Sequence, residues 1–416
     1  MAPTDRNAAD RDAAAPAADA MLAAALAHHK AGRLAVAEEA YRRILAAQAD
    51  HAEALHLLGA LLHQRGEHAA AVDFMRRALR ARPGVARYHN NLGSALNALK
   101  QCEAALECFR QAVALQPDFA DAHYNMGVAL SELGRIDEAL SCFGAAVAID
   151  PDHVQAHYNL ALMHKWQGRP DAAAAAFLDV LRLQPEQETA RHLLAALTGA
   201  DSARAPAAYV AATFDAAAER FDEHLVDELG YDAPQRLLEM LSALPELPAR
   251  PWDVLDLGCG TGLVGVAVAP HARQVAGVDL SARMLARAQA RGLYQRLQQA
   301  DALAMMAAEP AASYDVIVAA DMLIYTGRLE ELVLQVRRLL RPGGCYAFSA
   351  ECLEEADIAG RDGDYRLLPS GRYAHADNYL RRLAGANGFV VRASVRAPIR
   401  REAGKPIAGW LAVWQA

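Results

Sequence analysis

The chain has 416 residues, which is long enough for two or three domains that each bury a hydrophobic core. Alanine supplies much of the 54% hydrophobic content, and no stretch approaches the run of about eighteen strongly apolar residues that spans a membrane. The formal net charge of −8 disfavours a basic nucleic-acid module, so we expect neither a nucleic-acid nor a membrane partner.

The N-terminal segment and the cysteines bear on the compartment. Residues 1–17 are polar and rich in alanine and proline, without the apolar core of a signal peptide, so we expect a disordered leader. The six cysteines show no C-x-x-C pair, which indicates neither a zinc site nor a disulfide scaffold. We therefore expect a cytoplasmic protein with no metal.

The first half of the chain repeats every 34 residues, with Gly59, Gly93 and Gly127 in one register. Small residues at helix crossings and a proline after the second helix resemble the tetratricopeptide repeat. Five copies over 18–187 and a capping helix predict an α-solenoid domain over 18–197, with a concave groove. The other registers hold alanines and prolines, namely Ala37, Ala71, Ala105, Ala139 and Ala173, and Pro83, Pro117, Pro151 and Pro185.

A ladder of asparagines, Asn91, Asn125 and Asn159, follows the same period. Each amide offers a donor and an acceptor, so the ladder could bind the backbone of an extended peptide. It resembles the asparagine ladder in the repeats of O-linked N-acetylglucosamine transferases, which implies a protein or peptide partner. The alternative is that these amides form hydrogen bonds between helices of the solenoid.

A ladder of histidines, His89, His123 and His157, also follows the period and could be mistaken for metal ligands. Stacked repeats hold equivalent side chains too far apart to share one ion at bond lengths of about 2 Å. We therefore expect these histidines to be packing residues.

A small, polar stretch over 198–212 is expected to link the repeats to a second domain over 213–416. Two helices are expected first, over 213–227 and 233–243. Aliphatic runs then alternate with helical windows, which predicts a mostly parallel sheet with helices on both faces. The expected strands are 253–257, 274–280, 314–320, 345–351 and 389–395. Ligands of such sheets bind beyond the carboxyl ends of the strands.

The stretch "VLDLGCGTGLVG" over 254–265 is expected to form the first strand, a tight turn and the start of a helix. Gly258, Gly260 and Gly262 would let the backbone approach a ligand that a Cβ would push away. Dinucleotide-binding proteins share such glycine patterns, so the motif alone does not identify the ligand. Asp256 at the end of the strand and the motifs that follow decide against NAD.

Together with "GVDLS", "QQADAL", "YDVIVAADMLIY" and "LRPGG", this stretch resembles class I S-adenosylmethionine-dependent methyltransferases over about 210–416. The resemblance implies a Rossmann-like α/β domain that binds S-adenosylmethionine. It implies that Asp256 lies near the amino-acid end of the cofactor, with the three glycines under the ribose and methionine. Asp279 would hold the ribose hydroxyls, and Asp301 would face the adenine. The other implied cofactor contacts are Leu280, Met284, Ala302 and Asp321.

Candidate acceptor-site residues come from three segments. The loop from Asp321 to Tyr325 lacks the N/D-P-P-Y sequence, which favours a carboxyl, hydroxyl or amine acceptor. Arg372 and His375 lie in a turn-rich insertion, where they could bind an anionic group and take a proton, or His375 could pack against the sheet. We expect Tyr325, Arg372 and His375 to be catalytic. The segment 214–231 resembles helices that close over the cofactor, with Phe221 and His224 facing the pocket.

The arrangement resembles bacterial methyltransferases with N-terminal tetratricopeptide repeats. The leading hypothesis is an enzyme that transfers a methyl group from S-adenosylmethionine to an oxygen or nitrogen atom. The acceptor would be a protein, a peptide or a small molecule, and the repeats would recruit a substrate or partner. The alternative is an interaction scaffold whose second domain only binds or senses S-adenosylmethionine.

Overall fold

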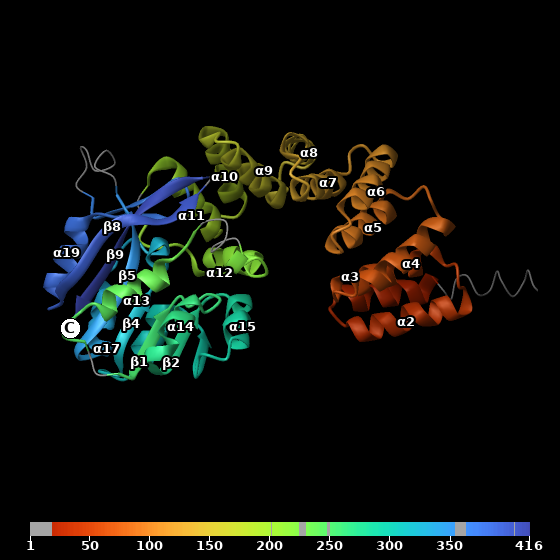
Figure 1. The fold of residues 1–416 in the computed structure, drawn as a ribbon. Coiled ribbons are helices and arrows are strands. Elements are labelled where there is room, and N and C mark those ends of the chain that lie inside the picture. The colour runs from red at the N-terminus through yellow and green to blue at the C-terminus, as the bar shows by residue number, and fades with distance from the viewer. Residues whose placement is uncertain (1–18, 201, 224–229, 248–249, 354–362, 403) are drawn as a thin grey trace, which may run out of the picture. The chain divides into compact units, whose positions relative to one another are not determined.

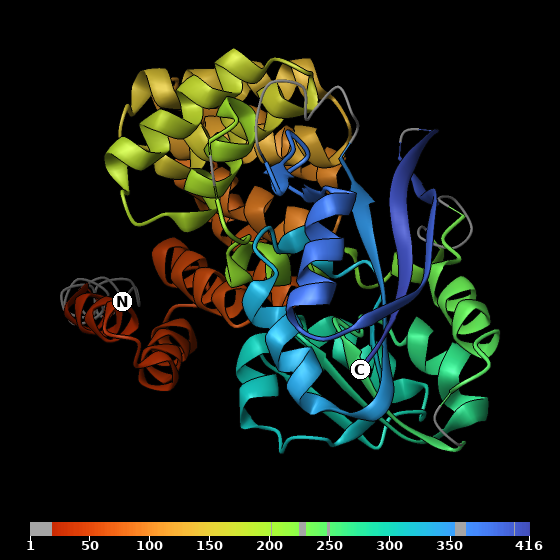
Figure 2. The ribbon, with the colours of Figure 1, turned by 90° about the vertical axis from the view of Figure 1, so that its left-hand side faces the viewer.

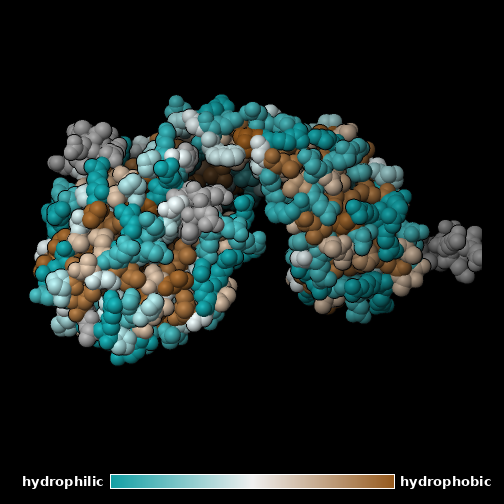
Figure 3. All heavy atoms as spheres, viewed as in Figure 1, coloured by the Kyte–Doolittle hydropathy of each residue, from teal (hydrophilic) through white to brown (hydrophobic). Residues whose placement is uncertain are grey.

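The computed structural model describes residues 19–200, 202–223, 230–247, 250–353, 363–402 and 404–416. The predicted leader and His224 lie outside these residues. The chain forms two compact units that divide between Pro185 and Glu186 (Figure 1). The predicted capping helix therefore groups with the second unit. Hydrophilic and hydrophobic side chains are intermixed over the face of each unit seen in Figure 3.

The first unit is built of consecutive packed helices, which confirms the predicted solenoid of tetratricopeptide repeats. A first helix covers 19–30 of the described residues. The helices that follow are α2 (Leu34–Ala47), α3 (Ala52–Gln64), α4 (His68–Ala81), α5 (Ala86–Ala98), α6 (Cys102–Leu115), α7 (Ala120–Glu132), α8 (Ile136–Ile149), α9 (Val154–Trp166) and α10 (Pro170–Leu183).

The repeat glycines allow close packing within each helix pair. A Cβ on Gly93 would lie 2.6 Å from the ring of Phe109, and one on Gly127 would lie 2.7 Å from the ring of Phe143. Both rings are buried, so each needs the space that a larger side chain would fill. The 34-residue period of the glycines thus follows from a 34-residue period of large side chains on the paired helix.

The turn inside each helix pair has its own 34-residue register, and four of its residues are glycines with positive φ. Lys100 occupies the same register with φ 61°, a left-handed conformation that disfavours a side chain with a Cβ. The glycines are Gly32, Gly66, Gly134 and Gly168, with φ of 74°, 84°, 73° and 69°.

The second unit contains a mostly parallel sheet with the strand order β3-β2-β1-β4-β5-β7-β6. Figure 2 shows the ribbon of this unit turned by 90° from the view of Figure 1. Strand β9 pairs antiparallel with β5 and β8. This arrangement confirms the predicted Rossmann-like α/β class. The strands are β1 (Trp252–Leu257), β2 (Ala272–Asp279), β3 (Arg296–Gln299), β4 (Tyr314–Ala319), β5 (Leu340–Cys352), β6 (Tyr365–Leu367), β7 (Tyr373–His375), β8 (Val390–Glu402) and β9 (Lys405–Gln415).

Helices cover both faces of this sheet. Leu255 on β1 packs in one buried cluster with Val336, whereas its neighbour Val254 packs in another with Leu237. Adjacent strand residues thus reach opposite cores, as expected for a parallel sheet buried on both sides. The helices are α11 (Glu188–Thr198), α12 (Ala207–Ala217), α13 (Ala233–Ser242), α14 (Leu263–Val268), η2 (Ala269–His271), α15 (Ala282–Ala290), α16 (Ala302–Ala308), η3 (Leu323–Tyr325), α17 (Glu330–Leu339) and α19 (Asp377–Ala386).

Several elements differ from the expectations. Helix α12 begins at Ala207, inside the stretch expected to be a linker. Strand β9 was not expected, and the turn-rich insertion contains the hairpin of β6 and β7. Each of these strands is held by its partner strand, which sequence periodicity does not reveal. Within the described residues, no helix is both long and apolar enough to cross a membrane.

We predict that Lys100→Gly is more stable than Lys100→Ala by about 1 kcal/mol, because only glycine relieves the left-handed strain. Both variants lose the exposed ion pair of Lys100 with Glu132, so their difference isolates the backbone effect. Chemical denaturation followed by circular dichroism measures it. An alanine variant as stable as the glycine variant would contradict the assigned strain.

Candidate functional site

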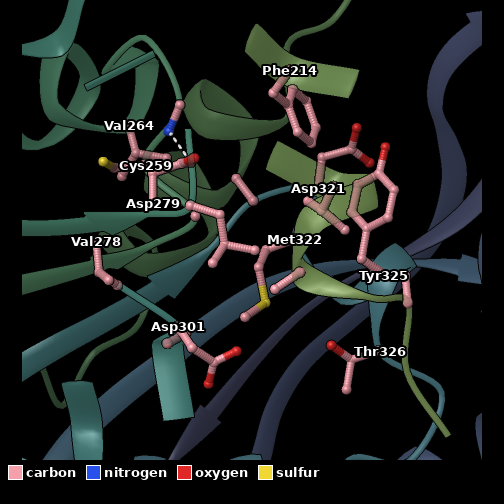
Figure 4. A pocket seen from close by; sticks show the side chains of 18 of the residues that line it. Phe214, Cys259, Val264, Val278, Asp279, Asp301, Asp321, Met322, Tyr325 and Thr326 are labelled. Atoms are coloured by element: carbon pink, nitrogen blue, oxygen red, sulfur yellow. Dashed lines mark hydrogen bonds between the residues drawn. The ribbon is translucent and has the colours of Figure 1, made fainter. Parts of the chain in front are cut away.

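The second unit contains a cavity at the carboxyl ends of its central strands. The turn after β1, the ends of β2 and β4 and the residues after β3 form its floor, and α12 covers it (Figure 4). The strand order reverses between β1 and β4, and such reversals are where parallel sheets bind ligands. The cavity therefore lies where the sequence predicts a ligand site.

The glycine turn after β1 forms one wall of the cavity. Gly258, Gly260 and Gly262 have φ of 67°, 52° and 93°, so all three use the conformation that favours glycine. A Cβ on Gly258 would lie 2.9 Å from the side chain of Met322, whereas a Cβ on Gly260 would meet nothing within 4 Å. Gly258 and Gly260 line the cavity, and Gly262 lies beyond it at the start of α14.

Asp279 ends β2 and faces the cavity with Leu280. Its carboxylate accepts backbone N–H groups from Gly260 at 2.9 Å and from Ser281 at 2.8 Å. Burial raises the pKa of Asp279, and the backbone donors act against that rise. The contact with Gly260 places an acceptor-only group beside the glycine turn.

Asp301 follows β3 and is the N-cap residue of α16. Its Oδ1 caps the helix by accepting from the backbone N–H groups of Leu303 and Ala304. Its Oδ2 accepts from Arg204 at 2.6 Å. Asp301 and Ala302 both line the cavity, as expected, whereas Arg204 was not anticipated because it lies in the predicted linker.

Two implied cofactor contacts lie behind the cavity wall. Asp256 is fully buried, and one of its oxygens accepts from Tyr294 at 2.6 Å while Oδ1 has no hydrogen-bond partner. Burial raises the pKa of Asp256 to about 7. Met284 is also fully buried and does not line the cavity, so direct packing on a ligand is not supported. Its position on the inner face of α15 points it toward the core instead.

Asp321 follows β4 and lines the cavity with φ of 59°, which is strained for a residue other than glycine. Its backbone N–H donates to Ser349 at 2.7 Å, and its Oδ1 accepts from Arg400 at 2.6 Å. Arg400 is buried and also pairs with Glu351. This cluster cannot be recognised from the sequence, because Arg400 lies 79 residues from Asp321 on β8.

Of the expected catalytic residues, only Tyr325 lines the cavity. Its ring contacts Phe214 edge to face at 5.5 Å, and burial raises its pKa to about 12. The nearby charge of Arg372 acts against this rise in the pKa of Tyr325. Arg372 itself lies outside the lining and pairs with Glu402 at 2.7 Å. Its charge is thus already matched by a carboxylate.

His375 does not meet the cavity, contrary to the expectation. It is fully buried on β7, and its Nε2 lies 3.0 Å and 3.1 Å from the carbonyl oxygens of Thr326 and Gly327. Burial lowers its pKa to about 4. A neutral ring that donates to these carbonyls supports the loop after β4, which is the packing alternative.

Helix α12 and the residues after it close the cavity. Phe214 and Phe221 line it, as expected for Phe221, together with Tyr231, which the sequence did not single out. Three acids four or three residues apart face three arginines on and after α15. The acids are Asp215, Glu219 and Asp222, and the arginines are Arg283, Arg287 and Arg291. This pairing holds the cover in place.

The asparagine ladder of the first unit forms hydrogen bonds between neighbouring repeats. Asn125 Nδ2 donates to Asn90 at 3.0 Å, and Asn159 Nδ2 donates to Tyr124 at 3.4 Å. Asn91 Nδ2 lies 2.9 Å from His56. Each partner lies 35 residues earlier, so the amide nitrogens join neighbouring repeats.

The histidines of the ladder contact the turn that precedes their own helix. The Nε2 atoms of His89, His123 and His157 lie 2.8 to 3.0 Å from proline carbonyl oxygens six residues earlier. Among the described residues, no cluster of three His, Cys, Asp or Glu side chains could hold a metal ion.

Family models match both units. A model of a methyltransferase domain matches 254–344. A model of the TPR repeat matches 93–134, and a model of the tetratricopeptide repeat matches 22–86 and 124–188.

Two relatives match the second unit's part of the chain. A malonyl-[acyl-carrier protein] O-methyltransferase of Enterobacter lignolyticus is 34% identical over 179 residues, which are 42% of this chain and 64% of that protein. A ubiquinone biosynthesis O-methyltransferase of Xanthomonas oryzae is 29% identical over 159 residues, or 35% of this chain and 66% of that protein. The chain thus spans less than two thirds of the length of these relatives.

Solved structures match on the repeat side. YrrB, titled a TPR protein with an unusual peptide-binding site, is 27% identical with a TM-score of 0.36, covering 41% of this chain and 89% of that one. TTC0263, a TPR protein of Thermus thermophilus, is 22% identical with a TM-score of 0.38, covering 44% of this chain and 98% of that one.

We predict that replacing Asn91, Asn125 and Asn159 together with alanine destabilises the repeats by about 1.5 to 4.5 kcal/mol, since each inter-repeat bond contributes about 0.5 to 1.5 kcal/mol. Thermal and chemical denaturation of the full chain measure the loss. An unchanged unfolding transition would show that the amide nitrogens do not join the repeats.

We predict that His375→Gln changes the pH dependence of stability. The folded protein keeps His375 neutral, whereas the unfolded chain protonates it below about pH 6.5, so wild-type stability falls as the pH drops from 6.5 toward 4. Glutamine can still donate a hydrogen bond but does not titrate. Relative to the variant, the wild type should lose about 1.4 kcal/mol per pH unit in this window. Denaturation at pH 7 and pH 5.5 tests this, and parallel profiles would contradict it.

Proposed function

We propose that this chain, a tetratricopeptide-repeat protein with a class I methyltransferase domain, transfers a methyl group from S-adenosylmethionine to an oxygen acceptor. The observation that carries the proposal is the contact between the Gly260 backbone and Asp279 at the cavity floor. It combines a glycine-rich turn and a fixed carboxylate at the ends of neighbouring strands. The names of the two relatives described above, both O-methyltransferases, favour oxygen over nitrogen.

The residues present fit the cofactor at three points. Above Gly260 there is open space where a Cβ would project, so a ligand can approach the backbone. Asp279 accepts hydrogen bonds and suits a pair of ribose hydroxyls. The Oδ1 of Asp256 is buried without a partner, which suits the charged amino group of an amino acid, directly or through a water.

We assign the cofactor contacts accordingly. Asp256 and the glycines would hold the amino-acid end, and Asp279 with Leu280 would hold the ribose. Asp301 would cap the adenine side, although its pairing with Arg204 makes that arginine part of the same contact. Met284 would not contact the cofactor directly, since it is buried on α15 and does not line the cavity.

Catalysis in this proposal depends mainly on positioning. When bound, S-adenosylmethionine supplies an electrophilic methyl group on a sulfonium, which an acceptor oxygen attacks in line. The covering residues Phe214 and Phe221 exclude water from the cavity. The aromatic and charged residues around Tyr325 would orient the acceptor.

We further propose that the repeats recruit a protein or peptide. Although the amide nitrogens of Asn125 and Asn159 bond to neighbouring repeats, no described residue donates to their side-chain oxygens. These oxygens could accept backbone N–H groups of an extended segment. The repeats would then bring either the methyl acceptor or a partner to the enzyme.

We predict that Asp279→Ala weakens S-adenosylmethionine binding by about 2 to 4 kcal/mol, because a charged acceptor of two hydroxyl bonds is lost. Isothermal titration calorimetry on the full chain measures this loss. Asp377→Ala is the matched control, since Asp377 lies on α19 and pairs with Arg381 away from the cavity. NAD should not bind the wild type.

Equal affinity of the Asp279→Ala variant and the wild type would contradict the cofactor assignment. Turnover separates the enzyme from a domain that only senses the cofactor. An enzyme produces S-adenosylhomocysteine when an acceptor is present, whereas a sensor binds without doing so.

A further inference from the structure

Among the six carboxylate oxygens that line the cavity, five already accept hydrogen bonds from described residues. Asp279 receives the backbone N–H groups of Gly260 and Ser281 on its two oxygens. Asp301 receives helix N–H groups on one oxygen and Arg204 on the other. Asp321 receives Arg400 on Oδ1 alone. No described residue donates to Asp321 Oδ2, so this oxygen is available to a ligand.

Several contacts hold Asp321 in this position. The left-handed backbone conformation of Asp321 is energetically unfavourable, as it is for other residues with a Cβ. The hydrogen bond from its backbone N–H to the buried Ser349 holds Asp321 in this conformation. Arg400 is 3% exposed and divides its two terminal nitrogens between Asp321 and Glu351. A carboxylate fixed through one oxygen presents the other in a defined direction.

The surroundings of Asp321 are apolar and aromatic. Figure 4 shows Phe214, Asp321 and Tyr325 grouped on one side of the cavity, apart from Asp301. Tyr231 and Met322 also belong to the lining. The cavity therefore offers one free carboxylate oxygen within a wall that suits an apolar or aromatic acceptor.

The charges of the lining disfavour an anionic acceptor. Arg204 is the single basic side chain among the described lining residues, and it pairs with Asp301. Arg372 pairs with Glu402 outside the lining, and Arg400 is buried between Asp321 and Glu351. A carboxylate acceptor would meet Asp321 with no free cation to offset the repulsion.

Other candidate bases near the cavity are unsuited to accept a proton at neutral pH. Burial raises the pKa of Tyr325 to about 12, and burial with nearby Asp321 and Asp256 raises that of Tyr231. Burial likewise raises the pKa of Cys259. His375 lies outside the cavity. The groups that act on Asp321 itself are thus Arg400, Glu351 and the two tyrosines.

We propose that Asp321 is the general base of the methyl transfer and that the acceptor is a neutral, weakly acidic hydroxyl such as a phenol. This inference rests on the proposed function. The acceptor oxygen bonds to the methyl carbon while the carbon–sulfur bond breaks and its electron pair stays on sulfur. The hydroxyl proton moves to Asp321 Oδ2, and Arg400 positions the carboxylate.

The weak basicity of a carboxylate limits how weakly acidic the acceptor hydroxyl can be. A carboxyl group has a pKa of about 4, and a phenol has one of about 10, as in tyrosine. Proton transfer from a phenol becomes favourable as the oxygen is methylated, whereas an alkyl alcohol is far less acidic and gains much less from so weak a base. A carboxylate acceptor would need no base at all.

The test uses the full chain with S-adenosylmethionine and defined probes, and mass spectrometry measures the methylated products. Catechol is the neutral phenol, 4-nitrocatechol is a phenol already ionised at about pH 8, and benzoate and octanoate are carboxylates. We expect the wild type to methylate catechol and not the carboxylates. We expect it to methylate 4-nitrocatechol more slowly than catechol, because the ionised phenol is repelled by Asp321. Transfer to the carboxylates alone, or to none of the phenols, overturns the proposal.

Asp321→Asn removes the base and keeps the shape of the side chain. We expect it to lose about 100-fold or more in turnover of catechol, and less than about 10-fold toward 4-nitrocatechol, whose proton is already gone. Asp377→Asn is the matched control, since it removes a carboxylate that pairs with Arg381 on α19 away from the cavity, and should change both rates only slightly. Equal losses on the two phenols would assign Asp321 a structural role and overturn the proposal.

Calorimetry with S-adenosylmethionine separates this inference from the proposed function. Unchanged cofactor binding in Asp321→Asn shows that the variant is folded. A wild type that binds the cofactor but shows the wrong acceptor pattern refutes only the role of Asp321. A wild type that does not bind the cofactor refutes the proposed function.

Discussion

The hydrogen bond from the Gly260 backbone to Asp279 is the contact on which the cavity depends. It joins the turn after β1 to the end of β2, and the N–H groups of Gly258 and Cys259 add two bonds to the Val278 carbonyl, at 2.9 Å and 3.0 Å. Backbone hydrogen bonds from Gly258, Cys259 and Gly260 therefore hold the turn against the end of β2. Binding of a ligand there would cost little free energy for ordering the protein, because the donors and the carboxylate are already in place.

The sequence predicted those parts of the fold that have local periodicity or a turn that requires glycine. The repeat register, the strand before the glycine turn and the acids after β2 and β3 are of this kind. The Arg400 contact with Asp321 spans 79 residues, and it depends on the placement of β8 beyond the antiparallel β9. The spacing of residues along the sequence does not predict that β8 lies beside β9.

The misplaced expectation for His375 has the same origin. A histidine in a segment rich in turn residues looks exposed, but β7 pairs with β5 and β6 and turns the ring toward the carbonyls of the loop after β4. Arg372, three residues earlier, lies nearer the surface and pairs with Glu402. Burial in a short paired strand is set by its partners, so a hairpin inside a loop is hard to recognise.

Glycine serves different purposes in the two units. This difference explains why the repeat glycines identify their structural role more clearly than the glycines of the turn after β1 do. In the solenoid, Gly93 and Gly127 make room for rings of the same chain, so the partner rings recur with the same period and confirm the register. In the second unit, Gly260 leaves space that no protein atom fills. A ligand, which is not part of the chain, would fill this space. The chemistry of that ligand must therefore be inferred from the carboxylates around the space. The carboxylates around the space, rather than the glycines themselves, therefore determine what the site can bind and which proton it can accept.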